Sequence, residues 1–105
     1  MASFFKKLFG NGAAANDGGA AKRSDPVEYQ GFLIQAAPLR EGEQWRLAGF
    51  IVKKDEAGDL ERAYSRADTF PSHEDAVTFS LRKGHQIIDE RGEKLFADGA
   101  PSGRV

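Results

Sequence analysis

Three segments in which apolar and polar residues alternate dominate the middle of the chain. They are residues 27–39 (VEYQGFLIQAAPL), 44–54 (QWRLAGFIVKK) and 60–70 (LERAYSRADTF), and the turn sequences REGE and DEAGD separate them. Alternation with a period of two is typical of β-strands, and short turns favour antiparallel neighbours. The pattern therefore predicts a three-stranded antiparallel β-meander.

A helical pattern follows the third segment, from His73 to Arg91. Ser72 suits the N-cap, Asp75 stands three residues further on, and Gly92 suits the C-terminal end. At about 100° per residue, the following residues fall in one arc of roughly 140°: Ala76, Val77, Ser80, Leu81, Gly84, Ile87 and Ile88. We expect this arc to face the sheet, with the small residues Ser80 and Gly84 at the closest approach, where they make room for Trp45. The predicted fold class is α+β, with one long helix packed on one face of the meander.

The remaining segments complete the domain organisation. Residues 1–10 (MASFFKKLFG) place Phe4, Phe5, Leu8 and Phe9 on one side of a short helix and two lysines on the other. That amphipathic pattern suits a surface, such as an anionic membrane, or docking on a protein. Residues 11–25, rich in Gly, Ala, Asn and Asp, are expected to form a flexible linker, and 26–97 a single domain in which Leu95 and Phe96 pack on the core or extend the sheet. Residues 98–105 are expected to be a disordered tail.

Charge and composition narrow the possible chemistry. Residues 1–23 hold four basic residues and Asp17, giving +3, whereas the rest holds 11 basic and 15 acidic residues, giving −4. Because nonspecific DNA affinity comes largely from neutralised phosphates, an acidic domain needs a local basic patch to bind DNA. The chain has no Cys, no strand-to-helix phosphate loop and no set of residues suited to nucleophilic catalysis. His73 and His85 stand about three turns apart on one helix and cannot share a metal. We therefore expect a protein that is not an enzyme and has no cofactor, metal or small-molecule substrate.

Two groups of residues are candidates for contacts. Arg46, Arg62 and Arg66 are expected to line one side of the sheet, where they would meet DNA. Phe79 lies outside the apolar arc of the helix and is expected to contact the N-terminal segment, residues 93–96 or a second subunit. Since both faces of the strands carry large apolar groups, one face is left partly uncovered. This predicts a homodimer that buries the uncovered face or Phe79.

The order of these segments resembles that of the HlyU family of small bacterial transcriptional regulators. The resemblance covers Val27 to Phe96 and the FFKKLFG motif, and its most specific parts are RADTF (66–70) and KGHQIIDERGEKLF (83–96). It implies a regulatory role in the cytoplasm. We expect the protein to act through DNA or a transcription protein. His85 stands where the family usually has a basic residue, which argues against a phosphate contact there. The chain lacks the run of three helices that a winged-helix regulator would need. The alternative function is a small protein-binding adaptor, tethered to a surface or membrane by residues 1–10.

Overall fold

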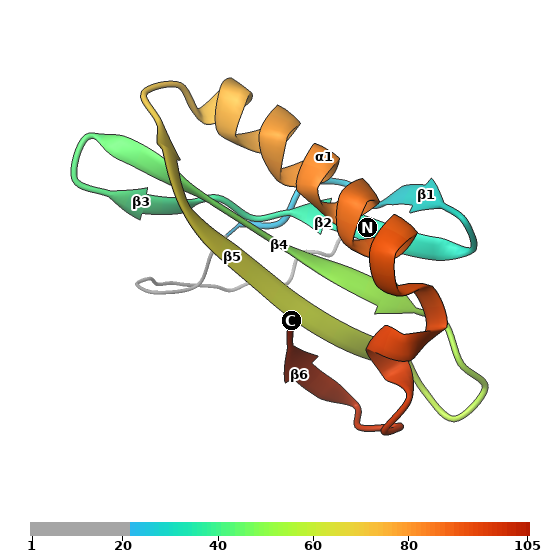
Figure 1. The fold of residues 1–105 in the computed structure, drawn as a ribbon. Coiled ribbons are helices and arrows are strands. Elements are labelled where there is room, and N and C mark those ends of the chain that lie inside the picture. The colour runs from blue at the N-terminus through green and yellow to red at the C-terminus, as the bar shows by residue number, and fades with distance from the viewer. Residues whose placement is uncertain (1–21) are drawn as a thin grey trace, which may run out of the picture.

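The computed structural model describes residues 22–105, which form a six-stranded sheet with one long helix across one of its faces (Figure 1). In chain order, the elements are β1 (Val27–Tyr29), β2 (Phe32–Ala36), β3 (Leu39–Glu41), β4 (Gln44–Lys53), β5 (Leu60–Phe70), α1 (His73–Arg91), the short 3-10 helix η1 (Gly92–Phe96) and β6 (Ser102–Arg104). The strand order is β1-β2-β4-β5-β6, and β3 also pairs with β4. The predicted α+β class is confirmed, but the predicted count of three strands is wrong.

The first predicted strand is divided into β1, β2 and β3. Gln30 and Gly31 both have positive φ, 55° and 85°, so the chain turns back and Tyr29 pairs with Phe32. Pro38 separates β2 from β3, because proline has no N–H to donate to a strand partner. Apolar residues stand on both sides of each break, so the three strands resemble one continuous segment in the sequence. β4 and β5 follow the second and third predicted segments closely.

The predicted bounds of α1 are confirmed by its caps. Ser72 Oγ accepts a hydrogen bond from the Asp75 N–H at 3.2 Å, and Gly92 adopts a positive φ while its N–H donates to the Ile88 carbonyl. Both arrangements satisfy backbone groups that a helix end leaves without partners. Five of the seven residues in the predicted arc are buried: Ala76, Ser80, Gly84, Ile87 and Ile88.

The close approach of helix and sheet is centred on Tyr64, not on Trp45 as predicted. The Tyr64 hydroxyl donates to the Ser80 carbonyl at 2.5 Å, and it lies against Gly49 and Gly84, where a Cβ atom on either glycine would meet it. Burial raises the pKa of this hydroxyl, which therefore remains a donor at neutral pH. Trp45 lies instead at the start of α1, with its ring edge-on to His73.

Both ends of the described chain are attached to the sheet. β6, which lies within the predicted disordered tail, pairs in parallel with Glu61–Ala63 of β5. At the other end, the Ser24 N–H donates to the Ala36 carbonyl at 2.8 Å, so the last residues of the expected linker run along β2. Within the described residues, no helix is long and apolar enough to cross a membrane.

Candidate functional site

The sheet has one face that α1 leaves uncovered. On β2, β4 and β5, Ile34, Ile51 and Tyr64 point toward α1 and are almost fully buried. Their neighbours in sequence point the other way because side chains alternate along a strand. We call that side the open face, and its central side chains are Gln35, Ala48, Phe50, Ala63 and Ser65.

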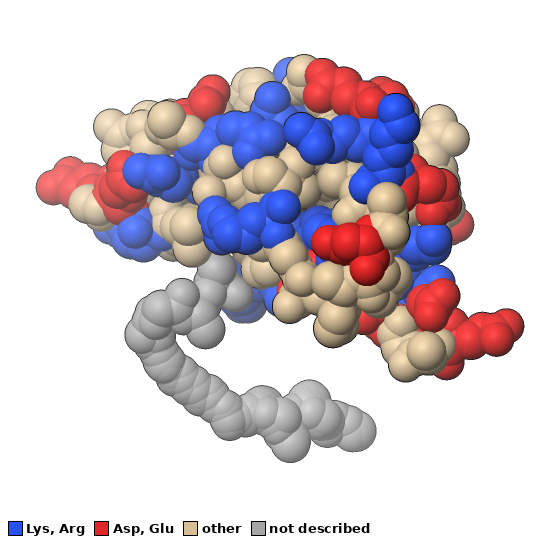
Figure 2. Space-filling view, turned by 60° about the horizontal axis from the view of Figure 1, so that its bottom comes forward, with Lys and Arg blue, Asp and Glu red and all other residues tan. Residues whose placement is uncertain are grey.

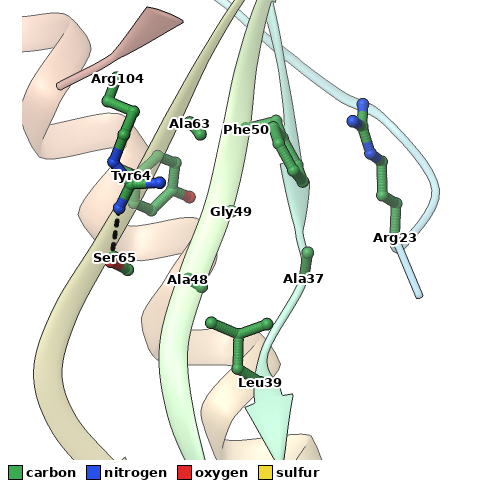
Figure 3. Close-up of a pocket in the computed structure, with 10 residues that line it drawn as sticks. All are labelled: Arg23, Ala37, Leu39, Ala48, Gly49, Phe50, Ala63, Tyr64, Ser65 and Arg104. Carbon is green, nitrogen blue, oxygen red and sulfur yellow. Dashed lines mark hydrogen bonds between the residues drawn. The ribbon is translucent and has the colours of Figure 1, made fainter. Parts of the chain in front are cut away.

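The open face contains a hollow of about 450 Å³ (Figure 3). Small residues from β4 and β5 line its centre, and the side chains of Phe50 and Leu39 rise beside it. The full lining is Arg23, Ala37, Leu39, Ala48, Gly49, Phe50, Ala63, Tyr64, Ser65 and Arg104. In Figure 3, Arg104 lies on one side of the hollow and Arg23 on the other, with the helix behind the sheet. The hollow therefore combines an apolar floor with a guanidinium at each side.

Arg23 has its charge matched within the chain. Its guanidinium lies 3.6 Å from the centroid of the Phe50 ring and donates to both carboxylate oxygens of Glu61, at 2.8 and 2.9 Å. The hydrogen bonds from Arg23 hold the pKa of Glu61 below its usual value. Arg23 thus spans the open face from the edge of β2 to β5, and it attaches the segment before β1 to the sheet.

Arg104 has no such partner. Its Nη2 donates to Ser65 Oγ at 3.3 Å, and none of the carboxylates in the described part of the chain lies within salt-bridge distance of it. Arg66 is similar: its Nη1 donates to the Ser65 carbonyl at 2.7 Å, and no described carboxylate pairs with it. Arg66 and Arg104 thus donate to different atoms of Ser65, and only Arg104 lines the hollow.

The expectation that Arg62 contacts DNA is contradicted by its burial. Its side chain points to the helix side of the sheet and is 3% exposed. Its Nε donates to the Leu95 carbonyl, one Nη to the Ala100 carbonyl and the other to Asp98, at 2.7, 3.0 and 2.7 Å. A backbone hydrogen bond from Ala100 and the charge of Arg62 lower the pKa of Asp98. Arg62 thus holds the segment between η1 and β6 in place and has no surface left for a phosphate.

The three predicted arginines therefore do not form one surface. Arg46 projects from β4 and pairs with Glu41 at 2.7 Å, so its charge is matched locally. Arg66 lies where the register of β4 and β5 shifts, between the pairs Ala48–Ser65 and Arg46–Thr69. An irregularity of this kind changes the direction in which side chains point, which strict alternation cannot anticipate.

Phe79 is 38% exposed, as expected for a residue outside the apolar arc. Its ring stacks on Phe70 at the end of β5, with centroids 4.9 Å apart, and the Arg82 guanidinium lies 4.9 Å from its centroid. The neighbour is thus the end of β5, and not residues 93–96 as predicted. A contact of Phe79 with a second subunit stays a prediction. Phe4, Phe5, Leu8 and Phe9, the other expected partner contacts, lie outside the described residues.

The two histidines are separated and have different neighbours. His73 meets Trp45 at the start of α1, whereas His85 stacks on Tyr29 with ring centroids 4.2 Å apart. The Tyr29 hydroxyl donates to Asp89 at 2.6 Å, and this hydrogen bond raises its pKa. Among residues 22–105 there is no group of three or more His, Cys, Asp or Glu that could hold a metal ion.

Charged side chains are unevenly spread over the surface. Figure 2 shows Lys and Arg in bands across the middle of one face, with uncharged side chains between them and Asp and Glu mainly toward the periphery. Residues 22–105 nevertheless contain 13 basic and 15 acidic side chains, a net charge of −2. The basic character of this face is therefore local.

Sequence reasoning missed Arg23 and Arg104, the two charged residues of the hollow. They lie in segments that composition assigns to a linker and a tail. The only sequence signal for them is a single arginine in each segment. In the structure, the Val105 N–H next to Arg104 extends the pairing of β6 by donating to the Ala63 carbonyl at 2.8 Å.

Comparison with known proteins gives one family. The family model described as "Transcriptional activator HlyU" matches residues 3–96, a span that runs from the N-terminal segment to the end of η1. No curated protein and no solved structure matches the chain.

Proposed function

Because this chain belongs to the HlyU family of transcriptional activators, we propose that it regulates transcription without catalysis, by holding a protein partner on the open face of its sheet. The proposal places the protein in the cytoplasm, where transcription takes place. The observation that carries it is the hollow between Arg23 and Arg104, which joins an apolar floor to exposed positive charge.

The composition of this face favours a protein partner over DNA. Tight DNA binding needs many phosphate contacts, since each neutralised phosphate adds to affinity. Here the described residues carry a net charge of −2, Arg62 is buried and Arg46 is paired with Glu41. Aromatic, aliphatic and arginine side chains around a concave centre are instead typical of the residues that dominate protein interfaces.

Filling the hollow tests this function. Ala63 lies on its floor, so Ala63→Phe places a ring where the partner would sit, while Ala57→Phe adds the same ring to an exposed turn as a matched control. Transcript levels in cells that carry A63F are expected to resemble those of a deletion strain, and cells with A57F are expected to resemble the wild type. Wild-type transcripts with a folded A63F protein would refute the proposal.

A DNA titration separates the two routes of regulation. Duplex DNA added at low salt to the isotope-labelled full chain is expected to leave the amide resonances of the open face unchanged. Shifts that cluster at Arg46, Arg66 and Arg104 and vanish with added salt would replace the protein partner by DNA.

The alternative function is a surface-tethered adaptor. It shares the open face as a protein-binding site but assigns residues 1–10 to an anionic membrane surface. A chain that lacks residues 1–10 distinguishes the two, since the proposed regulator keeps its partner without them and the adaptor loses its location.

A further inference from the structure

We propose that the hollow selects a partner segment in which a bulky apolar side chain stands next to a carboxylate, and that Arg104 is the residue that recognises the carboxylate. This rests on the proposed function, which requires only that some protein binds the open face. It adds the chemistry of the bound segment and the residue that determines its specificity.

The floor of the hollow accounts for the apolar part of the segment. Ala48, Gly49 and Ala63 leave space above the strands because their side chains are small or absent, whereas the Phe50 ring and Leu39, itself 38% exposed, project around that space. A volume of about 450 Å³ is within the range of ligand sites. An apolar side chain placed there removes surface from water on both sides of the contact.

The two arginines differ in what they offer a ligand. Arg23 already donates to both oxygens of Glu61, so an incoming carboxylate would have to displace an existing bidentate pair. Arg104 makes a single long hydrogen bond to a neutral hydroxyl, and the rest of its forked donor set is directed at no described carboxylate. A bidentate pair with a carboxylate is among the strongest hydrogen-bonded contacts of arginine. Arg104 is therefore the side at which the acidic group is recognised.

The surroundings of Ser65 distinguish Arg104 from Arg66. Arg104 donates to the Ser65 hydroxyl and lines the hollow, whereas Arg66 donates to the Ser65 carbonyl and does not line it. The anion is therefore assigned to Arg104. A nucleic-acid backbone fits less well, because a hydrated phosphate gains nothing from the apolar floor.

The fold holds Arg104 in position from two directions. β6 pairs with β5 so that Arg104 lies opposite Ala63, and the next N–H, that of Val105, donates to the Ala63 carbonyl. The segment that leads into β6 is held by the buried guanidinium of Arg62. A recognition residue on a paired strand is better preorganised than one on a free tail, so binding orders fewer groups.

The test uses three synthetic peptides of equal length titrated into the isotope-labelled full chain. Each carries a central Phe that is flanked by Asp, by Asn or by Lys. The Asp peptide is expected to shift the amide resonances of Ala63, Ser65 and Arg104 and to bind at least about tenfold more tightly than the Asn peptide at low salt. The Lys peptide is expected to bind most weakly.

Two variants assign the preference to its residue. Arg104→Gln is expected to reduce the preference for Asp over Asn to less than about twofold, because the amide keeps hydrogen bonding but loses the charge. Arg91→Gln removes an exposed arginine at the end of α1 and serves as the matched control that keeps the preference. A fourth peptide, with Ala for Phe between the aspartates, is expected to bind weakly because the floor stays empty.

The outcomes distinguish this inference from the proposed function. Equal binding of the Asp and Asn peptides, an unchanged preference in R104Q, or tight binding of the Ala peptide would overturn the acidic, apolar partner. Duplex DNA that displaces the Asp peptide and shifts the same resonances more strongly would also overturn it. If A63F still abolishes regulation in cells after any of these results, the proposed function stands and only the chemistry of the partner is wrong.

Discussion

Gly84 provides the sharpest test of how α1 packs on the sheet. A Cβ atom on Gly84 would lie 2.6 Å from Ile34 Cγ2 and 2.9 Å from the Tyr64 hydroxyl oxygen. Carbon atoms in good contact are about 3.5–4.0 Å apart, so Gly84→Ala forces the helix or Ile34 to move by roughly 1 Å. Alanine gains about 1 kcal/mol of helix propensity over glycine. Overpacking a core costs about 1–3 kcal/mol, so the substitution should lower the free energy of unfolding by about 1 kcal/mol overall.

Urea unfolding followed by the fluorescence of Trp45, the only tryptophan, measures this change. Gln86 is exposed on the same helix. The difference in the free energy of unfolding between Gln86→Gly and Gln86→Ala therefore measures the effect of helix propensity alone. G84A is also made in an Ile34→Ala background, which removes the clashing methyl group. There the contact with the Tyr64 hydroxyl remains, so G84A should still cost stability, but less than in the otherwise unaltered chain.

Ile→Ala in a core lowers the free energy of unfolding by about 2–5 kcal/mol. The two proteins with I34A are therefore compared in TMAO, an osmolyte that stabilises the folded state. G84A could instead raise the free energy of unfolding of the otherwise unaltered chain by as much as Gln86→Ala differs from Gln86→Gly. That result would refute the close approach of helix and sheet at Gly84. The same conclusion follows if the effect of G84A does not depend on Ile34.

Four further predictions concern other parts of the chain. Arg62→Met keeps the length of the side chain but leaves buried carbonyl groups unpaired. It should lower the free energy of unfolding by about 1–3 kcal/mol and remove the hydrogen-exchange protection of β6. Unchanged protection would contradict the role assigned to Arg62. The pKa of Glu61 is lowered in the folded chain by Arg23. The contribution of this contact to the free energy of unfolding is therefore fully present above the ordinary glutamate pKa and is lost as the pH falls through the lowered pKa. An NMR pH titration in which the Arg23 resonances do not follow that loss would argue against the contact. Sedimentation equilibrium should show the predicted homodimer, weakened by Phe79→Ser, and a monomer at high micromolar concentration would rule it out. If residues 1–10 bind membranes, liposomes with anionic lipids should co-sediment the full chain but not a chain that lacks this segment, whereas equal sedimentation would remove the membrane contact.

The sequence was most informative where structure depends on near neighbours. The bounds of α1 follow from Ser72 and Gly92, which satisfy the free backbone groups at its ends, and its buried stripe follows from a period of about 3.6 residues. The alternation in β4 and β5 located both strands for the same reason. The sequence pattern does not predict the hairpin at Gln30–Gly31, because Tyr29 and Phe32 on either side of it fit one alternating strand.

The site depended on contacts between distant residues. Arg62 and Arg104 both sit in exposed-looking sequence, yet one is buried and the other lines the hollow. Arg62 is buried because residues 95–100 return to it after α1, and Arg104 reaches the hollow because β6 adds to the edge of β5. Neither arrangement leaves a local pattern, since a three-residue strand is stabilised by the neighbour it finds and not by its own propensity.

The sequence by itself thus determined the α+β class, the long helix with its sheet-facing stripe and the family to which the chain belongs. The tertiary structure alone decided which face of the sheet remains open, which arginines keep an unmatched charge and that Tyr64 occupies the space at Gly84. The reason is physical: helix and strand periodicity are set within a few residues, whereas burial and charge pairing depend on which distant segments the sheet and α1 bring together.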